Sequence, residues 1–288
     1  MIVQAIIIWL TTWALYALVA AGFSLNSLVL KFSNFAYWTM IVLSWYFLYM
    51  FNNLNFPFIL SIILTIVASI LCWLIIYFLV RKPMKARHAS NLIMVIVSLA
   101  LGVLLESVIQ ICFWTEMKTI AFLTINKWYN LLWWTITPLQ IIILLVIVLL
   151  LAFLRFMVNT KFWKRIRALS DNYELAKIYW LKPEKIYIKT IIVSSIIASI
   201  WWILVALERN LYPSMWMGLT IKWFTWAVIG GIYSIPWSVL GAILVGILES
   251  LGVLILPATY KDAITFALLF IFLLVKPSWI FTKNSRKD

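Results

Sequence analysis

The feature that most constrains this chain is its series of long apolar stretches, which alternate with short segments that carry most of the charge. Phe56 to Val80, for example, holds no charged residue and is longer than the roughly 20 residues that a helix needs to cross a bilayer. Of the 288 residues, 66% are hydrophobic, whereas soluble domains are about half apolar. The sequence therefore excludes a soluble globular domain and predicts an integral membrane protein.

Length and hydropathy together predict about nine membrane passes in a single domain, residues 1–288. The seventh and eighth are the weakest, because Lys222 lies within the seventh and Gly230, Gly231 and Pro236 interrupt the pair. A half-helix that re-enters the membrane is the alternative there. The predicted fold class is an all-α membrane protein with eight or nine transmembrane helices, one of them broken or re-entrant. The expected passes run from Val3 to Gly22, Phe35 to Phe51, Phe56 to Val80, Ser90 to Phe113, Leu131 to Val158, Ile188 to Leu207, Pro213 to Ile232, Pro236 to Leu256 and Asp262 to Ile280.

The basic residues predict how the chain is oriented. Most of the 23 Lys and Arg fall in residues 81–87, residues 155–189 and the C-terminal tail, which nine passes place on one side of the membrane. Because basic loops stay in the cytoplasm, we expect a multi-pass protein of the inner or plasma membrane with a cytoplasmic C-terminus. The net charge of +14 comes from these loops and gives no reason to expect a nucleic-acid partner.

Other features of the sequence have plain structural interpretations. Cys72 and Cys112 lie inside apolar stretches, where we expect packed thiols rather than a disulfide. The N-terminal apolar stretch has no basic segment before it, so we expect a retained membrane pass rather than a cleaved signal. The chain is thus expected to keep all of its passes in the bilayer.

The longest polar segment, Thr160 to Lys189, contains eight basic and three acidic residues. Asp171 is predicted to cap a short helix, with Glu174 completing a capping box. Two interpretations stay open: an interfacial helix among the lipid headgroups, or a docking element for a cytoplasmic partner. The apolar face of this helix would carry Leu169, Tyr173, Ala176 and Trp180.

The sequence shows no catalytic constellation. Its one histidine, His88, excludes both a His-Glu-x-x-His zinc site and a Ser-His-Asp triad, and it contains no P-loop for ATP. Glu106 and Glu249 lie within apolar stretches, and an acid inside a membrane is by default a functional hypothesis. Both lie toward the ends of their stretches, which favours a structural role. We therefore expect neither an enzyme nor a bound metal or cofactor.

Four patterns occur in order along the chain. The first is ALYALVAAG at Ala14 to Gly22, and the second is Asn34-Phe35-Ala36, which is followed by Tyr37. The third is IGGIYSIPWSVLG at Ile229 to Gly241, and the last is Lys276-Pro277-Ser278-Trp279. Together with Thr160, Lys161, Trp163, Arg167, Ala168, Ala176 and Trp180 in the polar segment, they resemble the permeases of branched-chain amino acid ABC importers. The length suits the shorter of the two permease types.

The resemblance implies a transport subunit that moves branched-chain or related amino acids by ATP-driven alternating access. It implies three kinds of partner: cytoplasmic ATPase subunits that bind the ATP, a second permease subunit, and an extracytoplasmic substrate-binding protein. It places a cytoplasmic coupling loop at residues 159–187. The residues implied in ATPase coupling are Arg167, Ala168, Asp171, Ala176 and Trp180. Those placed near the substrate path are Asn34, Phe35, Ala36, Gly230, Gly231 and Ser234.

An alternative from another class is an ATPase-independent secondary carrier or channel for small solutes, which would use Glu106 or Glu249. Replacing Arg167 and Asp171 should uncouple an ABC permease and spare a carrier, whereas replacing Glu106 should do the reverse. A membrane scaffold without transport activity is a third interpretation.

Tryptophan stands at seven positions where the family pattern has glycine, and the chain has 18 Trp against 8 Gly. Three explanations stay open: divergence with wider helix packing, interfacial anchoring by Trp, or UGA codons that the source organism reads as glycine. The third predicts UGA at all seven positions, and UGG at Trp9, Trp13 and Trp180 would end it. The positions are Trp9, Trp13, Trp38, Trp163, Trp180, Trp237 and Trp279.

Overall fold

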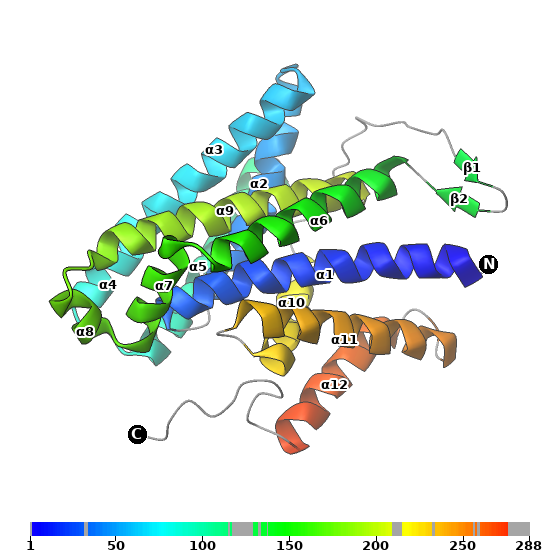
Figure 1. Ribbon diagram of the computed structural model, residues 1–288. Coiled ribbons are helices and arrows are strands. Elements are labelled where there is room, and N and C mark those ends of the chain that lie inside the picture. Colours follow the sequence, from blue (N-terminus) through cyan, green and yellow to red (C-terminus); the bar gives the residue numbers. More distant parts are fainter. Residues whose placement is uncertain are drawn as a thin grey trace. The chain divides into compact units, whose positions relative to one another are not determined.

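The computed structural model describes most of the chain, and Figure 1 shows its helices. Among the described residues the structure is helical, apart from one short hairpin in which β1 (Tyr129–Leu131) pairs antiparallel with β2 (Trp134–Ile136). The chain divides into two compact units, which we call the α1 unit and the α2 unit. The described residues are 2–31, 34–114, 116, 129–131, 134–136, 138–208, 215–231, 234–255, 257 and 260–275.

The α2 unit comprises Asn26–Leu123 and Ala152–Met217. Its central helix is α2, which contacts α3, α5 and α9. Trp38, Trp45 and Tyr46 of α2 are all buried, and Ser44 accepts a hydrogen bond of 2.8 Å from Ser69 of α3. The helices of this unit are α2 (Ala36–Asn53), α3 (Phe58–Ile76), the π-helical turn η1 (Tyr77–Arg81), α4 (Lys82–Ala86), α5 (Asn91–Phe113), α7 (Lys161–Asp171), α8 (Tyr173–Ile178) and α9 (Pro183–Glu208).

The most apolar helices of the α2 unit are also its most exposed. The membrane-length helices Phe58–Ala86 and Asn91–Phe113 have mean hydropathies of 2.9 and 2.6, yet only 22% and 17% of their most apolar windows are buried. Exposed side chains such as Ile59, Leu79 and Ile111 cover their outer faces. Surfaces of this kind are stable in lipid and unfavourable in water. The unit therefore presents a lipid-facing exterior around a more polar, aromatic centre.

The α1 unit comprises Met1–Leu25, Thr124–Leu151 and Gly218–Asp288. Within it Trp13 of α1 donates a hydrogen bond of 3.0 Å to Ser250 of α11, and Tyr16 stacks on Trp226 of α10 with ring centres 3.8 Å apart. Ser238 of α11 donates to the Ala20 carbonyl at 3.3 Å. These contacts fasten α1 to α10 and α11. The helices that contribute to this unit are α1 (Ile2–Leu30), α6 (Pro138–Val158), α10 (Met215–Gly230), α11 (Ile235–Ile255) and α12 (Lys261–Val275).

Six helices among the described residues are long and apolar enough to cross a membrane, so the predicted eight or nine are not confirmed. The central helix α2 corresponds to the expected pass from Phe35 to Phe51, but it is not among the six because it is rich in Tyr and Trp and therefore less apolar. The helices α10 and α12 have only 16 and 15 residues. The six are Trp9–Leu30, Phe58–Ala86, Asn91–Phe113, Gln140–Val158, Pro183–Val205 and Ile235–Val253.

The two predicted boundaries that differ most from the observed helices are the end of the first pass and the start of the fifth. The first pass was expected to end at Gly22, but α1 continues to Leu30. The fifth was expected to begin at Leu131, which instead belongs to β1, and α6 begins at Pro138. The first boundary was misplaced because the polar residues Ser24, Asn26 and Ser27 interrupt the apolar pattern inside α1. The second was misplaced because strand residues before α6 are apolar too. The end of the ninth pass, beyond Val275, lies outside the described residues.

Candidate functional site

The polar segment folds into two short helices, α7 and α8, at one end of the α2 unit. The Thr160 side chain caps α7 by accepting a hydrogen bond from the Trp163 N–H at 3.4 Å. Trp163, Ile166 and Leu169 form the buried face of this helix. The predicted coupling residues on α7 lie on the opposite face, and all three are exposed: Arg167, Ala168 and Asp171. The helix is thus amphipathic, with one face free for a partner.

The predicted cap at Asp171 was wrong. Asp171 is the last residue of α7, and the cap of α8 is Asn172, whose Oδ1 accepts a hydrogen bond from the Leu175 N–H at 3.0 Å. Asn172 is extended, with φ −147° and ψ 111°, so it separates α7 from α8. The expected continuous apolar face from Leu169 to Trp180 is therefore divided between two helices.

The end of α8 is an exposed apolar tip. Ala176 is buried, but the side chains after it project outward: Ile178 is 69% exposed, Tyr179 77% and Trp180 93%. Exposed apolar groups of this size typically mark a contact surface for protein or membrane. The tip is closed by a hydrogen bond of 3.1 Å from the Leu181 N–H to the Ala176 carbonyl. This bond fits a Schellman helix end, in which the residue at position 180 takes a left-handed conformation that glycine usually supplies.

Residue 180 does adopt that conformation, with φ 58°. This favours the explanation that glycine is encoded there, because a side chain is strained at positive φ. Trp38 and Trp163 instead lie within helices and are buried, where the backbone gives no such signal. The Trp13 indole fits against α11 because residue 246 of that helix is glycine. A Cβ at this position would lie only 2.5 Å from Cδ1 of Trp13. Trp279 lies outside the described residues.

Two charged contacts join α4 to the segments around α8. Lys85 Nζ lies 4.2 Å from the ring centres of both Tyr173 and Tyr187, and it donates a hydrogen bond of 2.7 Å to the Tyr187 hydroxyl. Lys82 forms an ion pair of 3.0 Å with Glu184 in the first turn of α9. The pattern of the sequence did not single out Lys82, Lys85 or Tyr187, because basic loops are usual at the ends of membrane helices.

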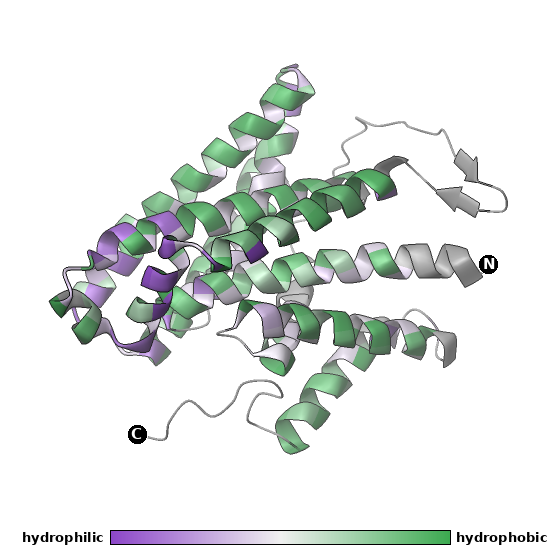
Figure 2. Ribbon diagram, in the orientation of Figure 1, coloured by the Kyte–Doolittle hydropathy of each residue, from purple (hydrophilic) through white to green (hydrophobic). Residues whose placement is uncertain are grey.

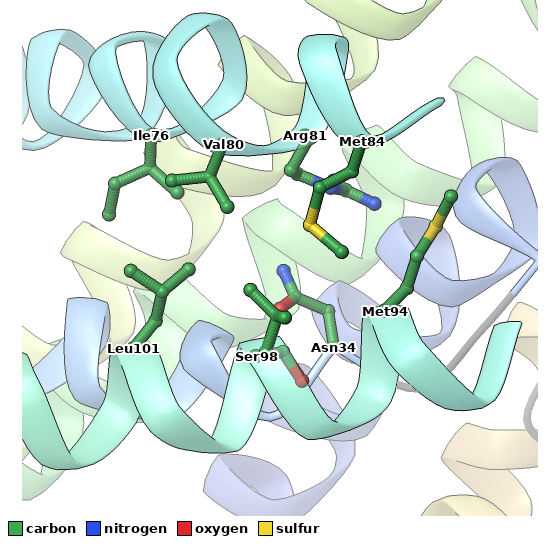
Figure 3. A pocket seen from close by; sticks show the side chains of 9 residues that line it. Asn34, Ile76, Val80, Arg81, Met84, Met94, Ser98 and Leu101 are labelled. Carbon is green, nitrogen blue, oxygen red and sulfur yellow. The ribbon is translucent and has the colours of Figure 1, made fainter. Parts of the chain in front are cut away.

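The predicted path residues Asn34, Phe35 and Ala36 lie at the start of α2. The Phe35 N–H donates a hydrogen bond of 3.1 Å to Ser98 of α5, and the Asn34 side chain is buried. Asn34, Ser98 and Arg81 line a small cavity between α5 and the π-helical turn (Figure 3). Its volume of about 20 Å³ has room for about one water molecule. In this structure the cavity is therefore too small for an amino acid.

The predicted path residues Gly230, Gly231 and Ser234 lie in the α1 unit, at a tight turn between α10 and α11. Gly231 has φ 119°, and its carbonyl accepts a hydrogen bond of 3.1 Å from the Ser234 N–H. A Cβ at Gly241 would lie 2.5 Å from the Gly230 nitrogen, so the two helix backbones touch at this point. Gly231 is favoured because its φ is positive, and Gly230 is favoured because another helix backbone lies against it.

The two acids of the apolar stretches lie in different units. Glu106 of α5 is half-buried and accepts a hydrogen bond of 3.1 Å from Gln110, one turn later. Glu249 of α11 is fully buried. The hydrogen bond between Gln110 and Glu106 joins two residues of the same helix. No group of three or more His, Cys, Asp or Glu suited to a metal is found among the described residues.

Comparison with known proteins gives a consistent result. The family described as branched-chain amino acid transport system, permease component, matches residues 5–273. The high-affinity branched-chain amino acid transport system permease protein BraD of Pseudomonas aeruginosa is 24% identical over 96% of this chain and 94% of its own length.

Two further relatives match over shorter regions. The permease protein LivH of Escherichia coli, from a high-affinity branched-chain amino acid transport system, is 30% identical over 51% of this chain and 48% of its own. A probable branched-chain amino acid transport permease protein LivH of Methanocaldococcus jannaschii is 28% identical over 62% of this chain and 58% of its own length. No solved structure matches the chain.

Proposed function

Because this chain belongs to the family of branched-chain amino acid transport permeases, we propose that it is the permease subunit of an ATP-driven importer. It would translocate branched-chain or related amino acids by alternating access. Its apolar helices support a multi-pass membrane protein. The ATP would be bound by partner subunits, because the chain contains no P-loop.

The observation that carries this proposal is the pair α7 and α8. A segment with a buried apolar face, an exposed basic face and an exposed apolar tip is suited to transmit force from a docked protein into the bundle. Arg167, Ala168 and Asp171 provide exposed contacts, and Trp180 lies at the tip. Ala176 would act differently, because its buried side chain packs α8 in place. In this proposal the ATPase subunits dock on the exposed surface.

The remaining parts of the assembly follow from the proposed mechanism. A second permease subunit would complete the translocation path, and a binding protein would deliver the substrate from outside. The basic α7–α8 segment and the C-terminus would both lie in the cytoplasm. We propose that Asn34, Phe35 and Ala36 in the α2 unit, and Gly230, Gly231 and Ser234 in the α1 unit, lie near the path. The small cavity at Asn34 has no room for an amino acid, so the conformational change of alternating access would have to open a larger space there.

The test is uptake of labelled leucine by proteoliposomes that contain the chain with its ATPase, second permease and binding protein. The double substitution Arg167→Ala with Asp171→Ala should abolish ATP-dependent uptake, because it removes exposed contacts without disturbing the buried face of α7. A matched control is Lys161→Ala with Lys164→Ala, which changes the exposed surface of the same helix outside the proposed contact set. Co-purification of the ATPase should be lost only in the first variant.

The alternative carrier makes the opposite prediction. Uptake that persists without ATP, survives Arg167→Ala with Asp171→Ala and is lost in Glu106→Gln would refute the importer and favour a secondary carrier. The local Glu106–Gln110 hydrogen bond leads us to expect little effect of Glu106→Gln on uptake.

A further inference from the structure

A second and larger cavity of about 680 Å³ lies in the α2 unit. Its lining comes from the C-terminal end of α1, from η1 and α4, from the start of α5, and from α7, α8 and the first turns of α9. Hydrophilic residues gather at this end of the unit, around α4, α7 and α8 (Figure 2). The volume is in the usual range for a small-molecule site.

The lining is strongly basic. It includes four cations, Lys31, Arg81, Lys82 and Lys85, and Glu184 is the one acid among the described residues that line it. Lys82 pairs with Glu184, and the four cations against one acid give the lining a net positive charge. A concave wall with this balance attracts anions and concentrates them.

The deepest of these cations is Arg81, at the end of the π-helical turn. One of its guanidinium nitrogens, Nη1, is buried. Turns of π-helix are uncommon and occur frequently at functional sites. Arg81 is the last residue of this turn, and it lines both the larger cavity and the small cavity beside Asn34. A cation at low dielectric interacts with an anion more strongly than a solvated one does.

Aromatic hydroxyls complete the wall. Tyr77, Tyr173 and Tyr187 line the cavity together with the cations. Because the Tyr187 hydroxyl accepts a hydrogen bond from Lys85, its own proton can be donated to a bound oxygen. Lys85 is itself held between two tyrosine rings, which fixes its ammonium at the cavity. Guanidinium, ammonium and phenol donors together match the several acceptor oxygens of a phosphate group.

We propose that this cavity binds a phosphate group at the cytoplasmic surface of the membrane. Its basic residues lie at the ends of membrane-crossing helices, the depth at which lipid headgroups lie, and basic pockets in this position bind anionic headgroups. The group comes from an anionic phospholipid or from soluble phosphate. The cytoplasmic placement rests on the orientation given in the proposed function, whereas phosphate binding does not depend on transport, because residues of this one chain line the cavity.

The test uses the full chain in detergent, with retained lipid counted by native mass spectrometry after addition of phosphatidylglycerol or phosphatidylcholine. Wild type should retain phosphatidylglycerol selectively. Lys31→Gln removes an exposed cavity cation, so it should leave the fold intact and weaken this binding about fivefold. Lys85→Gln should weaken it by a similar factor, and because Lys85 also contacts Tyr173 and Tyr187, the circular dichroism of this variant is first compared with that of wild type. Lys164→Gln is the matched control, because it removes the same charge from an exposed position outside the lining and should change nothing.

Inorganic phosphate, measured by its effect on the thermal unfolding temperature, separates the two sources. Lipid selectivity that Lys85→Gln abolishes supports the lipid source. Stabilisation of wild type by phosphate, lost in the same variant and without lipid selectivity, supports the soluble source. Equal losses in Lys164→Gln, or no binding of either probe, overturn the proposal. Unchanged lipid and phosphate binding in Lys85→Gln, with loss of ATPase binding, would instead make the cavity a protein contact.

Discussion

Replacing Trp180 by glycine should stabilise the protein, although it deletes the largest side chain. The residue has φ 58°, and a left-handed conformation costs a residue with a Cβ about 1–2 kcal/mol relative to glycine. The indole is 93% exposed, so its removal sacrifices little buried surface. The greater freedom of glycine in the unfolded chain costs about 0.5–1 kcal/mol. The net gain in the free energy of unfolding should therefore be about 0–1.5 kcal/mol, centred on about 0.75 kcal/mol.

Two further variants isolate the cause. Trp180→Ala removes the same indole but keeps the Cβ, so it should show none of the gain. Trp163→Gly replaces a buried residue inside α7 and should destabilise the protein by about 4–6 kcal/mol, from the loss of the buried indole and the glycine penalty in a helix.

The assay is equilibrium unfolding in mixed micelles with a rising fraction of sodium dodecyl sulfate, followed by far-ultraviolet circular dichroism. If Trp180→Gly destabilised the protein by about 1 kcal/mol or more, the argument would be refuted. The indole would then make stabilising contacts, although it is 93% exposed. A gain of the same size in Trp180→Ala would show that the exposed indole is unfavourable in itself, independent of backbone conformation.

Two other predictions concern glycine. The tryptic peptide from Ile178 to Lys185, isolated from the native organism, should have the mass expected for glycine at residue 180; a mass with tryptophan there would contradict the reassigned-codon explanation at this position. Gly241→Ala should lower the thermal unfolding temperature and the folded yield, because its Cβ meets the Gly230 backbone. Gly252→Ala is the control, since its Cβ meets only the Cδ1 end of Ile264, and an equal loss of stability in both variants would disprove backbone contact as the cause.

The sequence predicted the existence of most helices but not their roles. Hydropathy identifies Phe58–Ala86 because its residues are strongly apolar, with a mean hydropathy of 2.9. It undervalues α2, whose Trp38, Trp45 and Tyr46 are buried among other helices rather than exposed to lipid. Hydropathy reports how favourable transfer from water is, and it cannot distinguish burial in protein from contact with lipid.

The candidate site was predicted in part. Its amphipathic character followed from the spacing of apolar and basic residues, and α7 does bury one face. The division at Asn172 could not be predicted in the same way, because Asp171 and Asn172 are both good caps and only the backbone geometry selects between them. The cluster of Lys85 with Tyr187 was also beyond the sequence, since the two residues are 102 positions apart.

By itself the sequence determined the membrane class, the family and the exposed amphipathic segment, because these depend on composition, periodicity and local motifs. Only the tertiary structure decided that α2 is the centre of its unit, that Gly230 and Gly241 bring two backbones into contact, and that Arg81 and Lys85 share one basic cavity. The reason is physical: these features arise from packing between segments far apart in the chain. Neither the spacing nor the hydropathy of one segment records which other segment it will meet.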